Sequence, residues 1–192
     1  CVEYYEELWK EVRERVALKL GPITPDGTFT EKYRLVVEGP PNWTNFRDFW
    51  KLFYEHGAVF VGSTYTRVGG VYDYGFRHSA EDPLKSLAEY CMGCYTNRNL
   101  PQRIDLIEKF IKDCDADGLV INSIKSCNSF SAGQLAMMRD IEERRGIPVG
   151  FIETDLVDPR YYSYSNIKNR LDSFFQMLEQ RKELVGKAVL VS

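Results

Sequence analysis

A short apolar run near the middle of the chain, Gly118 to Ile121, constrains the fold most. The run has no polar residue at alternate positions, which is typical of a strand buried on both faces of a parallel sheet. A polar stretch from Asn122 to Ser129 follows it directly. We therefore expect a central strand whose carboxyl end opens into a polar loop.

Three further apolar runs predict strands at Arg34–Glu38, Ala58–Val61 and Ile147–Ile152. Gly39 and Pro40 end the first of them, because proline cannot continue a paired strand. Segments with helical spacing of apolar residues separate the runs, and this alternation indicates a parallel sheet with right-handed crossovers. The sequence therefore predicts an α/β fold, a flavodoxin-like three-layer domain with a four-stranded parallel sheet.

Residues that cap or begin helices stand between these strands. Asn42 or Thr44 can cap the helix after the first strand, and Pro101 sits at the start of another. Ser131 can cap the helix after the central strand. The apolar face of that helix is expected to consist of Leu135, Met138 and Ile141.

The first 32 residues precede the predicted sheet. Apolar side chains recur there at helical spacing as far as Leu20, and Gly21 with Pro22 supplies a stop. The apolar face of this helix either covers the sheet or belongs to an interface with other sequence. We therefore divide the chain into an N-terminal helix with its connecting loop, residues 1–32, and a flavodoxin-like α/β domain, residues 33–192.

The charge balance argues against some classes of partner. The chain has 25 Lys and Arg against 28 Asp and Glu, and no segment gathers a basic cluster, so no nucleic-acid partner is expected. No apolar run reaches the length of a membrane span, and we find no signal peptide. Five cysteines, an odd number, favour reduced thiols or metal ligands over a secreted disulfide scaffold. We expect a cytoplasmic protein without membrane contact.

Three of the cysteines are candidates for metal binding. Cys127 lies in the polar loop beyond the central strand, where open α/β sheets bind ligands, and an iron–sulfur cluster is the sharper hypothesis for its thiol. Cys91 and Cys94 form a Cys-x-x-Cys pair that a structural zinc site, a redox pair or buried inert thiols would each explain. Cys114, at the far end of a predicted helix, is expected to be buried and inert.

Five stretches of the chain match a known family. They are Ser63–Tyr72, Glu89–Asn97, Ile121–Gln134, Glu153–Tyr161 and Asn169–Leu171. Together they closely resemble the B-type subunits of the benzoyl-CoA reductase and 2-hydroxyacyl-CoA dehydratase family, over almost the whole chain. The resemblance corresponds to the carboxyl-terminal part of such a subunit. The amino-terminal domain, which in the family supplies further cluster cysteines, is therefore expected to lie outside this sequence.

The resemblance implies part of the catalytic subunit of an ATP-dependent aromatic acyl-CoA reductase, which reduces the ring of benzoyl-CoA to a cyclic diene thioester. It implies a [4Fe-4S] cluster held by cysteines of two domains, with Cys127 as the ligand from this chain and Cys91 and Cys94 as weaker candidates. The implied partners are a homologous second catalytic subunit and an ATP-hydrolysing iron–sulfur activator. The lack of a P-loop motif agrees with ATP hydrolysis on a separate component.

The long aromatic loop after the second strand supplies further candidates. Its possible proton donors are Tyr65, Tyr72 and His78. Arg67 and Arg77 could bind the phosphates of coenzyme A, although solvated surface charge explains them equally well. Beyond the fourth strand, Glu153 and Asp155 are expected to cap the last helix or bind Arg160 instead of acting in acid–base chemistry.

Two other functions stay open on this evidence. A 2-hydroxyacyl-CoA dehydratase would share the fold and the cluster, and would use the electrons to expel water. A structural zinc domain or an electron-carrying module would not be an enzyme. In either enzyme the isolated chain is expected to be inactive, because one cluster cysteine cannot hold a cubane.

Overall fold

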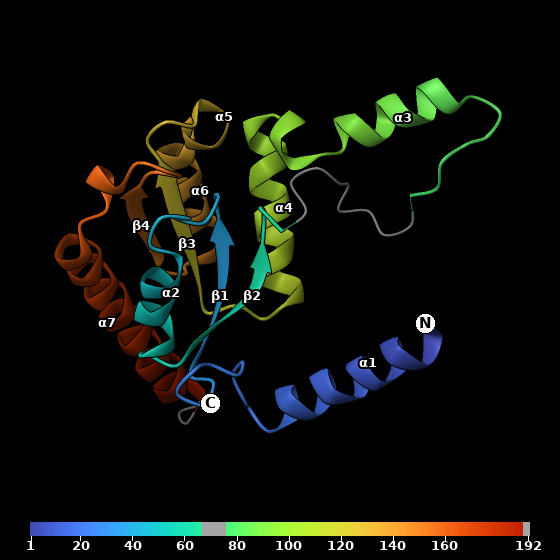
Figure 1. Ribbon diagram of the computed structural model, residues 1–192. Coiled ribbons are helices and arrows are strands. Elements are labelled where there is room, and N and C mark those ends of the chain that lie inside the picture. Colours follow the sequence, from blue (N-terminus) through green and yellow to red (C-terminus); the bar gives the residue numbers. More distant parts are fainter. Residues whose placement is uncertain (67–75, 190–192) are drawn as a thin grey trace.

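The structure is a computed structural model that describes residues 1–66 and 76–189. Its centre is a four-stranded sheet in which every strand runs parallel to its neighbours (Figure 1). The strands, in the spatial order β2-β1-β3-β4, are β1 (Tyr33–Glu38), β2 (Ala58–Ser63), β3 (Gly118–Ile124) and β4 (Val149–Thr154). The predicted α/β, flavodoxin-like fold with a four-stranded parallel sheet is therefore confirmed.

Helices cover both faces of the sheet and complete the three layers (Figure 1). They are α2 (Phe46–Tyr54) and α7 (Tyr164–Val189) on one face, and α4 (Leu100–Asp113) and α6 (Gln134–Arg145) on the other. Successive side chains of a strand point to opposite faces, so neighbouring residues of β1 enter different cores. Leu35 packs with the aromatic residues of α2 and α7, whereas Val36 packs with the isoleucines of α4.

Local signals set where these helices begin. Pro101 lies in the first turn of α4, as predicted, and Asn99 caps that helix with a complete capping box. The predicted caps of α2 are wrong by position, because its N-cap is Asn45. Asn42 instead accepts hydrogen bonds from the Asn45 N–H at 2.8 Å and the Thr44 hydroxyl at 3.0 Å, and so fixes the turn before the helix.

The central strand β3 is longer than its apolar run. All seven of its residues are buried, and its pairing with β4 continues through Ser123 and Ile124. The expectation of a polar loop from Asn122 onward is therefore wrong for the first three residues. A buried amide can extend a strand only where other groups satisfy its hydrogen bonds, and here Pro40, beyond β1, and Thr154 of β4 supply them.

Helix α6 begins later than predicted. Its N-cap is Gly133, with φ +85° in the left-handed region that favours glycine, and not Ser131. The buried face of the helix also differs from the expected one. It contains Gln134, Met137 and Ile141, whereas the expected Leu135 is 57% exposed.

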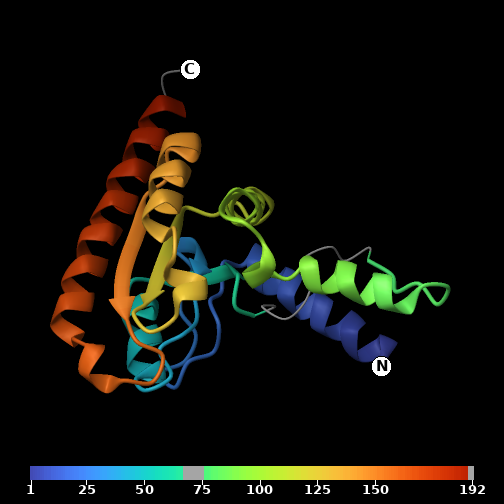
Figure 2. The ribbon, with the colours of Figure 1, turned by 90° about the horizontal axis from the view of Figure 1, so that it is seen from above.

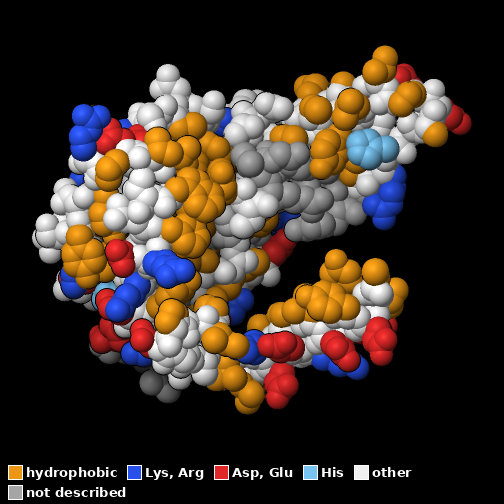
Figure 3. Space-filling model, viewed as in Figure 1, with side chains coloured by type: hydrophobic (Ala, Val, Ile, Leu, Met, Phe, Trp, Pro, Cys, Tyr) orange, Lys and Arg blue, Asp and Glu red, His pale blue; other side chains and the backbone are white. Residues whose placement is uncertain are grey.

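Two helices project from the body on the side of β2 (Figures 1 and 2). They are α1 (Val2–Ala17) and α3 (Pro83–Met92), and we call them the projecting arm. No residue of α1 is buried, so the first of the two alternatives for its apolar face, that it covers the sheet, is wrong. Figure 3 shows these apolar side chains as a stripe along the helix. Among the helices of the described ranges, none combines the length and apolarity needed to cross a membrane.

Candidate functional site

The carboxyl edge of the sheet holds the candidate site. From β1 the chain runs outward to β2 and then crosses back to β3 on the other side of β1, so the strand order reverses between β1 and β3. Open α/β sheets bind ligands beyond the carboxyl ends of their strands at such a reversal. The relevant crevice therefore lies between the loops that follow Glu38 and Ile124.

The loop after β1 lies directly against β3 because Gly39 has no side chain. Gly39 has φ +99°, and a Cβ at this position would lie 2.3 Å from the backbone oxygen of Asn122. The Gly39 N–H donates to Thr64 Oγ1, just beyond β2, at 3.2 Å. This turn therefore brings the ends of three strands together.

Buried amides fix the same edge. Asn122 Nδ2 donates to the Pro40 oxygen at 2.6 Å, and Thr154 Oγ1 donates to Asn122 Oδ1 at 2.8 Å. Asn42 Nδ2 donates to the backbone oxygen of Asp155 at 3.1 Å. A buried amide without hydrogen bonds would be costly, so these contacts strongly favour one arrangement of the loops.

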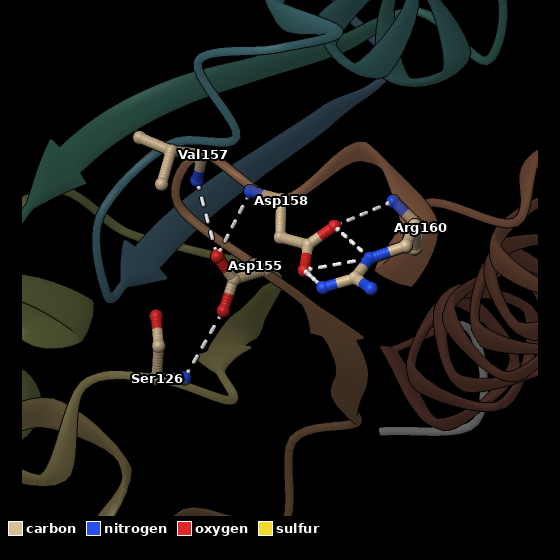
Figure 4. A network of polar contacts seen from close by, with 5 residues as sticks. All are labelled: Ser126, Asp155, Val157, Asp158 and Arg160. Carbon is tan, nitrogen blue, oxygen red and sulfur yellow. Dashed lines mark hydrogen bonds and ion pairs between the residues drawn. The ribbon is translucent and has the colours of Figure 1, made fainter.

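Asp155 joins the loops that follow β3 and β4 (Figure 4). Its carboxylate accepts hydrogen bonds from the backbone N–H groups of Ser126, Val157 and Asp158, each at 3.1 Å. Hydrogen bonds from Ser126, and smaller contributions from those of Val157 and Asp158, lower the pKa of Asp155 to about 2. Arg160 is bound by Asp158, so the expectation that Asp155 binds Arg160 is wrong.

Glu153, at the end of β4, also has partners other than the expected ones. Its carboxylate forms ion pairs with Lys125, in the loop after β3, and with Arg170 of α7 at 3.5 Å. All three side chains are partly exposed, so these ion pairs contribute little stability. Their effect is to hold the outer part of the loop after β3 beside β4.

Cys127 begins the four-residue helix α5 (Asn128–Ser131), just beyond β3. Its side chain is half-buried and packs at the border of an aromatic cluster around Phe130. The Cys127 backbone oxygen accepts hydrogen bonds from the N–H and the hydroxyl of Ser131, both at 2.9 Å. Cys127 therefore lies at the mouth of the sheet and not in its deep interior.

An apolar cavity of about 490 Å³, the aromatic cavity, opens beside this mouth. It lies between α2, β2 and the loop after β1, and its aromatic lining consists of Trp43, Phe46, Trp50, Tyr54, Phe60 and Tyr65. The rings of Trp43 and Phe46 stack with centroids 5.3 Å apart. Tyr65 contacts Trp43 on one side and Phe130 on the other, at centroid distances of 6.2 and 6.3 Å. Tyr65 thus lies between the aromatic cavity and the group of packed side chains around Phe130, which Cys127 borders.

The described residues bring one thiol, and not a complete metal site, to this edge. Cys91 is exposed on α3, and Cys94 is buried where its thiol contacts a carbonyl of that helix. Cys114 is half-buried and lies near the amino edge, where its carbonyl accepts a hydrogen bond from Arg34. Within residues 1–66 and 76–189, no group of three or more His, Cys, Asp and Glu is placed to hold a metal ion. A Cys127 thiolate fits one ligand of an iron–sulfur cluster, whose other ligands would come from elsewhere.

Tyr65 is the predicted proton donor that the structure brings to this edge. Arg77 and His78 are exposed and lie in the segment that leads into α3 of the projecting arm. The His78 ring packs against Tyr90, and its Nδ1 lies 3.4 Å from Ser86 Oγ. The other predicted residues of this loop, which lie outside the described residues, are Arg67 and Tyr72.

Sequence reasoning missed a buried acid. Glu38 is fully buried and accepts hydrogen bonds from the Tyr95 hydroxyl at 2.9 Å and from Gln134 Nε2. Burial raises the pKa of Glu38 to about 7, against the opposing effects of these two hydrogen bonds and of the Arg103 charge. The signal was present in the sequence, because Glu38 closes an apolar strand directly before Gly39.

Comparison with known proteins identifies the family. A family described as "2-hydroxyglutaryl-CoA dehydratase, D-component" matches residues 1–178. The B subunit of benzoyl-CoA reductase from Thauera aromatica is 66% identical over 95% of this chain, and the alpha subunit of (R)-2-hydroxyglutaryl-CoA dehydratase from Acidaminococcus fermentans is 26% identical over 97% of it. The chain spans only 42% and 37% of these two relatives. It belongs to the 2-hydroxyglutaryl-CoA dehydratase D-component family.

Proposed function

We propose that this chain is part of the iron–sulfur catalytic subunit of an ATP-dependent aromatic acyl-CoA reductase, which reduces the ring of benzoyl-CoA to a cyclic diene thioester. One observation carries the proposal. The chain is 66% identical to the B subunit of benzoyl-CoA reductase from Thauera aromatica, but only 24 to 26% identical to five subunits named as dehydratases. The benzoyl-CoA reductase branch is therefore favoured within the family.

Cys127 would supply this chain's ligand to a [4Fe-4S] cluster, with the other ligands outside the described residues. Its half-buried position beyond β3 supports this role, because a ligand thiol must be reachable by iron and shielded from bulk water. Such a cluster, when bound, supplies electrons of low potential. Cys91 and Cys94 are weaker candidates, because one is exposed on the arm and the other is buried against its own helix.

The aromatic cavity would receive the ring of the acyl group. A cavity of ~150 Å³ is enough to bind benzene, so about 490 Å³ has room for a ring and part of the thioester arm. Flat aromatic groups gain from stacking on aromatic side chains, and Trp43 and Phe46 offer an exposed pair of stacked rings. Only the width of the Tyr65 ring separates this cavity from the cluster around Phe130.

Tyr65 is the proton donor that this geometry favours. Ring reduction consumes protons as well as electrons, and a positioned side chain can deliver them. Tyr65 lines the aromatic cavity and also packs beside Cys127, whereas His78 is exposed in the segment that leads into α3. Arg77, in the same segment, is a candidate for the coenzyme A phosphates.

The partners would be a homologous second catalytic subunit and an ATP-hydrolysing iron–sulfur activator. Both relatives above are named as subunits, which supports an assembly of several chains. The isolated chain would be inactive, because the described residues provide no group of three metal-binding side chains. The same observation weakens the alternative of a structural zinc domain.

The test is turnover by the assembled enzyme. The chain is expressed within its complete subunit, together with the homologous subunit, under strict anaerobiosis, and is then given activator, ATP and a reduced electron donor. Conversion of benzoyl-CoA to a cyclic diene thioester is expected. Tyr65→Phe keeps the ring and removes the hydroxyl, and should lower kcat by at least ~10²-fold, whereas His78→Gln in the segment before α3 should not.

The second candidate function is dehydration of a 2-hydroxyacyl-CoA. The match of residues 1–178 to a dehydratase family and the similarity to dehydratase alpha subunits favour it. The same preparation distinguishes the two functions. Turnover of a 2-hydroxyacyl-CoA without any reduction of benzoyl-CoA would establish the dehydratase and overturn the reductase.

A further inference from the structure

The segment that presents Cys127 has little stability of its own. α5 contains four residues, and a helix this short does not form in water without outside support. Other elements reach it at the Ser129 carbonyl and at the Phe130 ring. The position of Cys127 therefore depends on side chains from elsewhere in the fold.

Arg103 of α4 holds α5 and the single 3-10 turn η1 (Tyr95–Asn97) at once. Its guanidinium donates to the backbone oxygen of Ser129 at 2.5 Å, of Thr96 at 2.9 Å and of Arg98 at 3.1 Å. The side chain is buried, and its guanidinium carbon lies 5.2 Å from the centre of the Tyr95 ring in η1. The Arg103 side chain therefore connects η1, the turn before α4, to α5, the helix that follows Cys127.

Tyr95 completes the connection to the sheet. It is fully buried, and its ring stacks on Phe130 with centroids 5.8 Å apart. Its hydroxyl donates to Glu38 Oε1 at the end of β1. A continuous series of contacts thus runs from Glu38 through Tyr95 and Phe130 to the border where Cys127 packs.

Gln134 is the second side chain that binds the carboxyl group of Glu38. The Gln134 amide donates to Glu38, and within the described ranges Gln134 Oε1 has no hydrogen-bond partner. Two donors therefore converge on one acid, although a buried acceptor beside it is left unpaired. A protonated Glu38 could donate to Gln134 Oε1, whereas the charged form leaves this acceptor unpaired.

We infer that Glu38 is a positioning residue for Cys127: its carboxyl group fixes Tyr95 and, with Arg103, the short helix that Cys127 begins. The bearing of this inference on catalysis rests on the proposed function. Three elements face the acid, namely η1 with the Tyr95 hydroxyl, α4 with the Arg103 cation and α6 with the neutral Gln134 amide. Loss of the carboxyl group, or its ionisation in this buried place, loosens Tyr95 and α5, so that the thiol becomes easier to reach.

The test measures how fast each cysteine of the full chain reacts with methyl methanethiosulfonate, by mass spectrometry of its peptides. Cys91, exposed on α3, is the internal reference. Glu38→Leu removes the carboxyl group that binds the Tyr95 hydroxyl and the Gln134 amide, so it should raise the ratio of the Cys127 rate to the Cys91 rate about tenfold. In the unchanged protein the ratio should also rise as the pH rises from about 6 to about 8, because ionisation of the buried Glu38 disfavours the closed arrangement. A purely steric role of Glu38 would not produce this pH profile.

Two further variants make the result decisive. Glu153→Gln removes another carboxylate from the same edge, one that faces Lys125, and should leave the ratio unchanged. Tyr95→Phe removes only the hydroxyl that binds Glu38 and should raise the ratio part of the way. Cys114, near the other edge, reports global unfolding. If Glu38→Leu also makes Cys114 reactive, Tyr95→Phe becomes the deciding variant.

The inference is overturned if Tyr95→Phe and folded Glu38→Leu both keep the ratio within about twofold of the unchanged protein. It is also overturned if the pH profile of the ratio is the same with and without Glu38. The measurement needs no iron, substrate or activity. Its failure would therefore leave the proposed function standing, and failure to reduce benzoyl-CoA would leave the positioning of Cys127 standing.

Discussion

The carboxyl edge of the sheet and the projecting arm differ in how many of their side chains are buried and bound by other parts of the chain. At the edge, buried polar groups bind one another across long stretches of sequence, as Asn42 binds Asp155 and Gln134 binds Glu38. On α1, no residue is buried and the indole of Trp9 is more than half exposed. The edge is organised before any ligand arrives, whereas the apolar stripe of α1 stays exposed in the structure.

The largest effect is expected at the turn that closes the edge. Gly39→Ala would force a side chain into φ +99° and place its Cβ 2.3 Å from the Asn122 oxygen, so the backbones of the β1 loop and β3 must separate. We expect a loss of about 4 kcal/mol in the free energy of unfolding, measured by urea denaturation. Gly27→Ala is the matched control, since it has φ +101° with nothing within 4 Å, and should cost only about 1 kcal/mol. Equal losses would mean that the edge is not tightly closed.

The next effect depends on pH. Because burial raises the folded pKa of Glu38 from 4.5 to about 7, its contribution to stability is fully present below pH 4.5 and is lost as the pH rises through about 7. The free energy of unfolding should fall by on the order of 3 kcal/mol over this range through Glu38 alone. Glu38→Gln removes that dependence, so the difference between the two proteins isolates it. A constant difference between pH 4.5 and 8 in urea titrations would contradict the prediction.

A smaller effect of opposite sign is expected at Asp155. Its pKa is lowered to about 2, so its contribution is present above the ordinary value of 3.8 and is lost as the pH falls through about 2. Asp155→Asn weakens hydrogen bonds from three backbone N–H groups and should cost about 2 kcal/mol at pH 7. The cost should shrink in acid. Asp158→Asn, which loses an exposed pair with Arg160, should change stability far less.

Most of the fold could be predicted from the sequence because hydrophobic periodicity reports burial locally. The four strands and the helices between them were found in this way. The end of β3 was not, because Asn122 is buried by virtue of Pro40, 82 residues away, and Thr154, 32 residues away. The start of α6 was missed because the left-handed conformation of Gly133 cannot be read from the amino-acid composition.

The site was predictable in the same uneven way. The position of Cys127 beyond a central strand followed from the order of apolar run, polar loop and helix. Glu38 was missed because the partners that make it a buried acid, Tyr95 and Gln134, lie 57 and 96 residues away. The aromatic cavity was missed for a similar reason, since Tyr65 meets Trp43 only once β1 and β2 are side by side.

The smallest effect is expected on the arm. Trp9→Gln removes an indole that is 58% exposed, so the free energy of unfolding should change by less than about 0.5 kcal/mol in urea titrations. The guanidinium carbon of Arg13 lies 4.6 Å from the centre of the Trp9 ring, and such a cation–π contact is of modest strength at an exposed site. Phe49→Ala, on the fully buried face of α2, is the matched aromatic control and should cost about 4 kcal/mol. A loss above about 1.5 kcal/mol for Trp9→Gln would mean that α1 packs against the body in solution, and the contrast between the two regions would then fail.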